Sequence, residues 1–396
     1  MHLQKWRGRA ESGSERTGAR SVRHERDRGP LLPLRKDASG KTAPNPRFGG
    51  KYDTSRTGLV QLPHTSEHMR ILVTGANGQI GSELVEALRQ RHGPEQVVGL
   101  DLNPPPTANG PSAAAPFEVM DVRDREALAG VLDRHEIGTI YHLASLLSAT
   151  GEQHPDRAWD VNMSGLKNVL DLARRRPVDT VFWPSSIAVF GPTTPRDDTP
   201  QNTVLDPTTM YGVTKRSGEL LCRYYHRRYD LDVRSLRYPG LLSYKTAPGG
   251  GTTDYAIDML TQAAAGEDYT CFLEPDTRLP MMYMPDAIQG TLALMDADAD
   301  ALSVRDSYNA GALSFAPAEL AAAIRARVPT FDCHYEPDER QRIAENWPSS
   351  VDDTAARTDW DWAPEYDLDA LTEDMLHHLR ENVRAPGNVG EKKRGR

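Results

Sequence analysis

The sequence predicts an α/β protein whose parallel sheet is covered by helices on both faces. From Met69 onward, short apolar and β-branched runs alternate with helical patterns, which is typical of parallel sheets. The runs are apolar throughout, as expected of strands buried on both faces. A glycine-rich turn joins the first run to the first helical pattern. Together these observations indicate an open sheet that binds ligands at the carboxyl ends of its strands.

The glycine-rich turn carries Gly75, Gly78 and Gly81, between a predicted strand at residues 71–74 and a helical pattern that begins at Gln79. Glycines allow a tight turn and let backbone N–H groups approach a ligand closely. The following helix directs the positive end of its dipole at the same point. A pyrophosphate fits this arrangement, which favours a Rossmann-type, doubly wound sheet. A glycine triplet also occurs by chance in turns, so the neighbouring elements matter.

Acidic residues follow the next two predicted strands. Asp101 comes directly after a strand at residues 97–100, where an acid can hydrogen-bond the ribose of an adenine dinucleotide. Its carboxylate would repel a ribose 2′-phosphate, which favours NAD over NADP. A third strand at residues 117–122 carries Asp121 near its end.

Strands and helices alternate up to residue 240, and we expect His142, on the fourth strand, to be a satisfied core histidine rather than a catalyst. Beyond residue 240 the elements become shorter and mixed, which predicts a smaller lobe that closes over the substrate. We predict strands at residues 139–145, 181–191 and 233–240, a loop at residues 248–254, and helices at residues 124–134, 155–176, 211–229, 255–265, 340–347 and 369–380, with a further helix start near residues 314–320.

These patterns divide the chain into a disordered basic extension (1–68), an NAD-binding domain (69–240), a mainly substrate-binding C-terminal lobe (241–384) and a disordered tail (385–396). Residues 1–68 are rich in Arg, Gly, Ser and Pro and cannot bury enough apolar area to fold. Acidic residues there argue against a transit peptide. We expect translation to start at Met69, and a basic arm with a binding partner is the alternative.

Charge and cysteine usage narrow the class of protein. The net charge of −9 conceals an acidic body, because residues 69–384 carry −19 whereas residues 1–68 carry +7 and residues 385–396 carry +3. Such a body is not expected to bind nucleic acid or an anionic membrane. It suits a salt-rich cytoplasm or, alternatively, reflects a GC-rich genome. The three cysteines are widely separated, so we expect neither a disulfide framework nor a zinc site, and a reducing cytoplasmic location is the simplest interpretation. We expect no membrane span either, because the sequence lacks an apolar run of ~20 residues.

Tyr211 and Lys215 are four residues apart in a predicted helix, which puts both on one face. An ammonium beside a phenol favours the phenolate and lowers the phenol pKa. A cationic nicotinamide would lower that pKa further, and a tyrosine tuned in this way can act as general base on an alcohol. Such a pair is also common in ordinary helices. The glycine loop upstream and the intervening Ser185 and Ser186 favour the catalytic interpretation.

Ser185 and Ser186 end the predicted fifth strand, where ligands of open α/β sheets bind. Capping of the strand end is the alternative role for these hydroxyls. With the glycine loop and Tyr211-Gly-Val-Thr-Lys215, the pattern resembles the extended short-chain dehydrogenases. The resemblance implies that Ser186 is the catalytic hydroxyl, with Tyr211 as base and Lys215 beside it. It also implies NAD contacts from Gly75, Gly78, Gln79, Ile80, Gly81, Asp101, Asp121, Val122, Leu143, Ala144, Asn162, Ser185, Tyr211, Lys215, Tyr238 and Pro239.

Longer stretches resemble the short-chain L-threonine 3-dehydrogenases in particular: residues 142–152 and 237–255, Thr277-Arg-Leu-Pro-Met-Met-Tyr283 and Ile343-Ala-Glu-Asn-Trp-Pro348. This resemblance spans residues 69 to about 379. It implies NAD-dependent oxidation of L-threonine at its β-hydroxyl to 2-amino-3-oxobutanoate, on the way to glycine or aminoacetone, in a homodimer that pairs the helices from Pro155 and Tyr211. It makes Ser148, Ser185, Ser186, Tyr211, Thr252, Thr253 and Trp347 candidates for binding the substrate, although Thr252 and Thr253 could also cap a helix and Trp347 could pack in a hinge.

Two other functions stay open. A nucleotide-sugar epimerase or dehydratase would keep NAD bound and release no NADH, but the acidic C-terminal third disfavours a diphosphate. A non-catalytic regulator that senses NAD would not need both Tyr211 and Lys215. Formation of NADH with L-threonine would separate the three functions.

Overall fold

The computed structural model describes residues 69–105, 115–246 and 251–384. The expectations for residues 1–68, for the tail and for part of the loop at residues 248–254 therefore lie outside the described residues. Among the described residues, no helix is long and apolar enough to cross a membrane.

A six-stranded parallel sheet organises the first half of the described chain, in the order β3-β2-β1-β4-β5-β7. The order runs outward from β1 in both directions, so the strand order reverses between β1 and β4. Ligands of open α/β sheets bind at such a reversal. The fold class predicted from the sequence is confirmed. The strands are β1 (Arg70–Thr74), β2 (Val97–Asp101), β3 (Phe117–Val119), β4 (Ile137–His142), β5 (Thr180–Phe182) and β7 (Asp232–Arg234).

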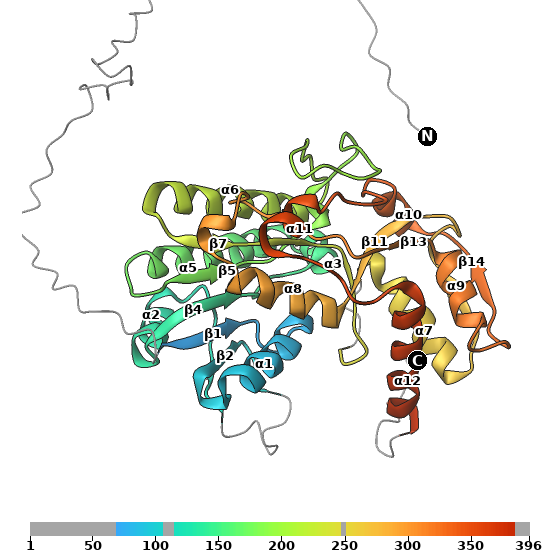
Figure 1. Ribbon diagram of the computed structural model, residues 1–396, viewed down its shortest axis with the longest axis horizontal. Helices are drawn as coiled ribbons and strands as arrows, with labels where there is room; N and C mark the ends of the chain where they lie inside the picture. Colours follow the sequence, from blue (N-terminus) through green and yellow to red (C-terminus); the bar gives the residue numbers. More distant parts are fainter. Residues whose placement is uncertain (1–68, 106–114, 247–250, 385–396) are drawn as a thin grey trace, which may run out of the picture. The chain divides into compact units, whose positions relative to one another are not determined.

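Successive side chains of a strand point to opposite faces of the sheet. Because successive residues of these strands are both apolar, both faces must be covered, and helices cover them. Leu72 packs with α2 (Arg125–Arg134), α5 (Gly165–Ala173) and α6 (Met210–Tyr229), whereas Val73 packs with α1 (Gln79–His92) and α8 (Met284–Asp296). Figure 1 shows α5 and α6 on one side of the strands and α1 and α8 on the other. The same division recurs at Val98 and Val97, Ile140 and Tyr141, and Val181 and Phe182.

Three predicted elements are interrupted. The helix expected at residues 155–176 contains α4 (Pro155–Trp159), a π-helical turn (Asp160–Ser164) and α5. The strand expected at residues 181–191 ends at Phe182, because Pro184 cannot donate to a ladder. The next two residues, β6 (Ser185–Ser186), pair instead with β8 (Leu236–Tyr238), which also pairs with β12 (Tyr308–Asn309). The sixth predicted strand is likewise divided into β7, β8 and β9 (Gly240–Leu242).

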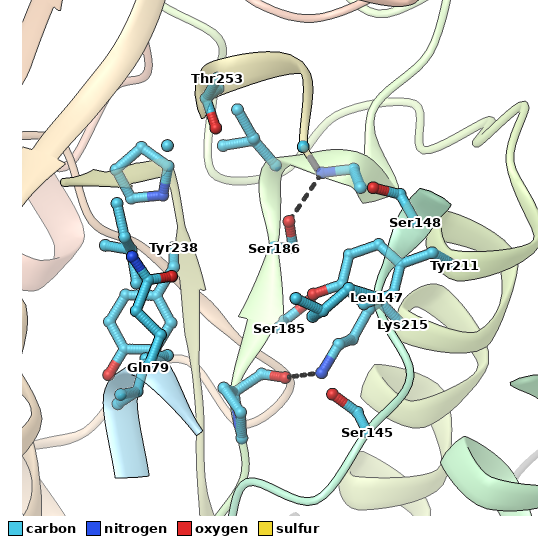
Figure 2. Close-up of a pocket in the computed structure, with 18 of the residues that line it drawn as sticks. Gln79, Ser145, Leu147, Ser148, Ser185, Ser186, Tyr211, Lys215, Tyr238 and Thr253 are labelled. Atoms are coloured by element: carbon cyan, nitrogen blue, oxygen red, sulfur yellow. Dashed lines mark hydrogen bonds between the residues drawn. The ribbon is translucent and has the colours of Figure 1, made fainter. Parts of the chain in front are cut away.

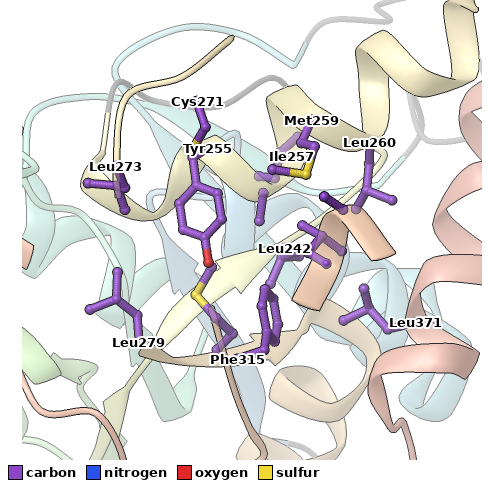
Figure 3. Packing of buried hydrophobic residues seen from close by; sticks show 14 of the residues in the cluster. Leu242, Tyr255, Ile257, Met259, Leu260, Cys271, Leu273, Leu279, Phe315 and Leu371 are labelled. Atoms are coloured by element: carbon purple, nitrogen blue, oxygen red, sulfur yellow. The ribbon is translucent and has the colours of Figure 1, made fainter. Parts of the chain in front are cut away.

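The C-terminal third builds a third hydrophobic cluster, part of which Figure 3 shows around Leu242, Tyr255 and Phe315. Strand β11 (Leu279–Tyr283) pairs with β9 in parallel and with β13 (Leu313–Phe315) in antiparallel orientation. Helix α12 (Leu368–Arg384) packs against α7 (Tyr255–Ala265) and α9 (Pro317–Arg325). The remaining elements are α3 (Ser148–Gln153), β10 (Tyr269–Cys271), β14 (Cys333–Tyr335), α10 (Glu339–Ala344) and α11 (Thr354–Trp360).

Candidate active site

Two adjoining cavities of about 240 and 190 Å³ lie at the carboxyl ends of β1 and β4, where the strand order reverses. Both are lined by Gly75, Gly78, Leu143 and Ser145. The first extends toward β6, α6 and Thr252, and the second toward the ends of β2 and β3. An elongated ligand that spans the crevice would therefore reach both the predicted ribose site and the predicted catalytic group.

The glycine loop meets the requirements of a pyrophosphate cradle. Gly75 has φ +71°, in the left-handed region that favours glycine. A Cβ atom on Gly81 would lie 2.0 Å from the carbonyl oxygen of Gly75, so a side chain there has no room. Helix α1 begins at Gln79 without a side-chain cap on its N-terminus, which leaves its first N–H groups for a ligand. Gln79, Ile80 and Gly81 all line the first cavity, so the residues present fit a dinucleotide.

The two acids after β2 and β3 line the second cavity together with Val122 and Ala144. The Oδ2 atom of Asp101 accepts a hydrogen bond from the backbone N–H of Asn77 (3.1 Å), which ties the acid to the glycine loop. The carboxylate of Asp121 is bound by Arg123, and that hydrogen bonding lowers the Asp121 pKa. Both acids thus stand at the predicted ribose end of the crevice as fixed groups.

Tyr211 and Lys215 lie at the start of α6 and line the first cavity. Figure 2 shows both side chains reaching from the helix toward Ser185 and Ser186 on β6. The Nζ atom of Lys215 donates a hydrogen bond to the carbonyl oxygen of Pro184 (2.7 Å) and lies 5.4 Å from the centre of the Tyr211 ring. The interruption of the strand at Pro184 therefore supplies the acceptor that orients the lysine.

The direction expected from the sequence for the phenol pKa is wrong. Burial raises the pKa of Tyr211 to about 12, against a smaller lowering by hydrogen bonding with Ser186. Burial also lowers the pKa of Lys215 to about 7. Each shift reflects the cost of charging one group alone away from water. At the 5.4 Å that separates Nζ of Lys215 from the centre of the Tyr211 ring, a charge on one group would shift the pKa of the other.

The two serines differ in their bonds. The Oγ atom of Ser186 accepts a hydrogen bond from the backbone N–H of Ala188 (3.2 Å), as Figure 2 shows. The Oγ atom of Ser185, which is buried, donates to Glu219 (2.7 Å). Both residues line the first cavity. Because successive side chains of a strand point to opposite faces, Ser185 is directed to Glu219 on α6, whereas Ser186 is bonded to the backbone of Ala188.

The candidate substrate residues meet in the first cavity, although they come from distant parts of the chain. Ser148, Thr252, Thr253 and Trp347 all line it. Thr252 and Trp347 are buried, so these side chains belong to the walls rather than to the rim. Tyr238 and Pro239 also line it, but the hydroxyl of Tyr238 is bonded to Thr291 on α8 and points away from the cavity.

Asn162 is the one predicted site residue that lines neither cavity. Its side chain accepts from the N–H of Leu146 (2.7 Å) and donates to the Leu146 carbonyl (3.1 Å) and to Thr214 (3.0 Å). It therefore holds the loop after β4 against α6. His142 is a buried core residue, as expected, but it is only half satisfied. Its Nδ1 atom is bonded to Thr74 (2.7 Å), whereas its Nε2 atom has no hydrogen-bond partner among the described residues, and burial lowers its pKa to about 3.

Sequence reasoning missed the carbonyl of Pro184, the cavity-lining Ser145 and Leu147, and the buried Glu219. A signal for Glu219 was present, since it follows Tyr211 and Lys215 at helical spacing and so shares their face.

Comparison with known proteins identifies the family of the chain. A family model described as the NAD-dependent epimerase/dehydratase family matches residues 71–311, more than half of the chain. An uncharacterised epimerase/dehydratase of Staphylococcus haemolyticus is 46% identical over 313 residues, which are 79% of this chain and 98% of that protein. NAD is the cofactor that this match implies, in agreement with the prediction from the sequence.

Solved structures give a narrower similarity. An L-threonine dehydrogenase from Cupriavidus necator, in its holo form, is 55% identical with a TM-score of 0.76, and the match covers 78% of this chain and 99% of that one. A monomeric L-threonine 3-dehydrogenase from a metagenome is 47% identical with a TM-score of 0.75, covering 79% and 99%. The resemblance to L-threonine 3-dehydrogenases found in the sequence is thus confirmed by these neighbours.

Proposed function

The chain belongs to the NAD-dependent epimerase/dehydratase family, and on this premise we propose that it oxidises L-threonine with NAD at the β-hydroxyl, forming 2-amino-3-oxobutanoate. The observation that carries the proposal is the 47–55% identity to solved L-threonine dehydrogenases over nearly their whole length. The meeting of Ser186, Tyr211 and Lys215 with Thr252 and Trp347 around one cavity supports it.

In this mechanism, the phenolic oxygen of Tyr211 accepts the proton of the substrate hydroxyl, and Ser186 donates a hydrogen bond to the same substrate oxygen. The ammonium of Lys215 stabilises the phenolate, which burial alone disfavours. When bound, NAD supplies the nicotinamide that accepts the hydride from the β-carbon. Asp101 accepts hydrogen bonds from the ribose, and the glycine loop holds the pyrophosphate.

The walls of the first cavity formed by Ser148, Thr252, Thr253 and Trp347 are proposed to surround the amino acid. Three of these residues, Thr252, Thr253 and Trp347, lie in the C-terminal part that begins at residue 241. We assign to this part the role of a substrate lobe. The product, a β-keto acid, would lose its carboxylate to give aminoacetone or be cleaved to glycine by a second enzyme.

The alternative is a nucleotide-sugar epimerase or dehydratase. The S. haemolyticus relative is named as an uncharacterised epimerase/dehydratase, without a substrate. Its substrate carries a diphosphate, which proteins bind with arginine and lysine. Among the described residues that line the first cavity, Lys215 is the only lysine or arginine, and its Nζ is bound to Pro184. The cavity therefore favours the smaller amino acid substrate.

The test is formation of NADH by the purified protein, followed by absorbance. We expect NADH with L-threonine and NAD, and much less reduced cofactor with NADP because of Asp101. Conversion of a UDP-sugar without net NADH, and no reaction with L-threonine, would overturn the proposal in favour of the epimerase.

We also propose a homodimer built on α4 and α6. Their outer surface exposes Trp159 (47%), Leu220 (42%) and Tyr224 (51%), and neighbouring exposed apolar side chains mark association surfaces. One of the solved relatives is described as monomeric, so the oligomeric state of this chain needs its own measurement.

A further inference from the structure

Ser185 and Ser186 are adjacent, yet their hydroxyl groups are engaged in opposite senses. Ser186 accepts from the N–H of Ala188, and its own proton serves an oxygen acceptor, here the phenol of Tyr211. Ser185 donates a hydrogen bond to the Oε1 atom of Glu219 (2.7 Å). A hydroxyl has one proton and two lone pairs, so Ser185 can only accept any further hydrogen bond.

The carboxylate of Glu219 cannot easily turn away from the Ser185 hydroxyl. It is completely buried, and its Oε1 atom also accepts from Nε of Arg237 (2.8 Å). Its Oε2 atom accepts from the same guanidinium (3.1 Å) and from Arg216 (3.0 Å). Rotation of the carboxylate would leave a buried charge without its partners, which is strongly unfavourable.

Arg237 is itself anchored directly beside the serine. It pairs with Ser185 in the register of β6 and β8, and it is only 2% exposed. Its Nη1 atom donates to the carbonyl of Gln201 (3.1 Å) and to the side chain of Asn309 (3.0 Å). The acceptor of the Ser185 proton is therefore fixed by α6, by β8 and by the segments around Gln201 and Asn309.

Resting on the function proposed above, we propose that Glu219 is a positioning residue that holds the proton of Ser185, so that Ser185 accepts an N–H group of the bound ligand. Ser186, with the opposite polarity, serves the substrate oxygen. The two neighbouring serines thereby distinguish a nitrogen donor from an oxygen. In the proposed reaction, N–H donors are carried by the ammonium of the amino acid and by the carboxamide of the nicotinamide.

The experiment is a double-mutant cycle with Ser185→Ala, Glu219→Gln and the double variant. The amide introduced by Glu219→Gln is a neutral acceptor and therefore weaker than the carboxylate. We expect kcat/KM to fall about tenfold in Ser185→Ala, as for one lost hydrogen bond, and roughly three- to tenfold in Glu219→Gln. If Glu219 acts through Ser185, Glu219→Gln should cause no further loss in the Ser185→Ala background.

The kinetic constants identify the ligand group. A raised KM for L-threonine with unchanged Kd for NAD assigns the ammonium, and a raised Kd for NAD assigns the carboxamide. Unchanged constants in Ser185→Ala, or losses that multiply in the double variant, overturn the proposal.

Two controls separate this role from a structural one. Arg216→Met disturbs the same carboxylate at Oε2, away from Ser185, and should alter thermal stability more than KM or Kd. If Glu219→Gln does not fold, Glu219→Met with Arg237→Met replaces the buried pair by apolar side chains of similar size in the same cycle.

If the wild-type protein itself makes no NADH from L-threonine, the proposed function fails first. The cycle is then measured as Kd for NAD, and an unchanged Kd in Ser185→Ala overturns the inference.

Discussion

Helix α6 reverses the pattern of an ordinary surface helix at four positions, although it buries Cys222 and Tyr225 in the usual way. The inner face buries ionisable groups, with Lys215 3% and Glu219 0% exposed. The outer face exposes Leu220 and Tyr224, at 42% and 51%. An amphipathic helix usually buries its apolar stripe and exposes its charges.

Different forces must therefore hold the two faces. Removing charges from water is costly even when they are paired, so Lys215 and Glu219 are weak sources of stability. Their bonds to Pro184 and Ser185 instead orient groups of the cavity. Exposed apolar side chains do not stabilise the isolated chain, but covering them with a partner removes apolar area from water and so favours association. The inner face is thus suited to chemistry and the outer face to association.

The largest effect is expected from Lys215→Met on the inner face. This change removes the charge that stabilises the phenolate and the contact with NAD that the family resemblance implies. Both kcat and the affinity for NAD should fall, and kcat should lose about 100- to 10,000-fold, the usual worth of a general base. Lys167→Met, on α5, is the matched control because that lysine is exposed and pairs with Asp171. Unchanged NAD affinity in Lys215→Met would separate the lysine from the cofactor.

Tyr211→Phe should affect chemistry alone. It removes the phenolic oxygen that accepts the proton while the ring still lines the cavity. We expect kcat to fall about 100- to 10,000-fold and the Kd for NAD, measured by fluorescence titration, to stay near that of wild type. Retention of more than about a tenth of kcat, well outside the range for a general base, would mean that another residue takes the proton.

The inner face was predictable as far as it depends on local pattern. The spacing of Tyr211 and Lys215 fixes a shared helix face, and the glycines between β1 and α1 fix the cradle, so both could be inferred from the printed sequence. The sign of the pKa shifts could not, because desolvation depends on how completely distant elements cover the two groups.

Tertiary pairing accounts for the other differences. A two-residue strand such as β6 has no periodicity of its own, and its pairing with β8 joins residues about fifty positions apart. The approach of Trp347 to the cavity likewise depends on the packing of the C-terminal third. Asn162 was assigned by resemblance alone, and its role in holding Leu146 follows only from the π-helical turn that presents it.

The pH dependence of activity tests the inner face as a coupled pair. The first proton that the pair loses is governed by Lys215, whose pKa is lowered to about 7, and the remaining proton can reside on the lysine with the charge on Tyr211. With NAD saturating, kcat/KM for L-threonine should therefore rise as pH increases through this lower value. In Lys215→Met the tyrosine must lose its own proton, so the limb should move upward toward the Tyr211 pKa of about 12. A limb at the same pH in both proteins contradicts coupling.

The smallest effect on activity is expected from the outer face of α6, where Leu220→Asp introduces a charge into the proposed contact. Covering an apolar patch drives association, and a charge there has to be desolvated without a partner. Sedimentation should therefore show a dimer for the wild-type protein and a monomer for Leu220→Asp. The kcat should stay near that of the wild type, because Leu220 lines neither cavity. Val204→Asp is the control, since Val204 is 55% exposed but lies outside α6, and it should leave the mass unchanged.

A monomeric wild-type protein would remove association as the reason for the exposed face. A dimer that survives Leu220→Asp would place the contact elsewhere, and in either case the contrast between the two faces of α6 would need a different explanation.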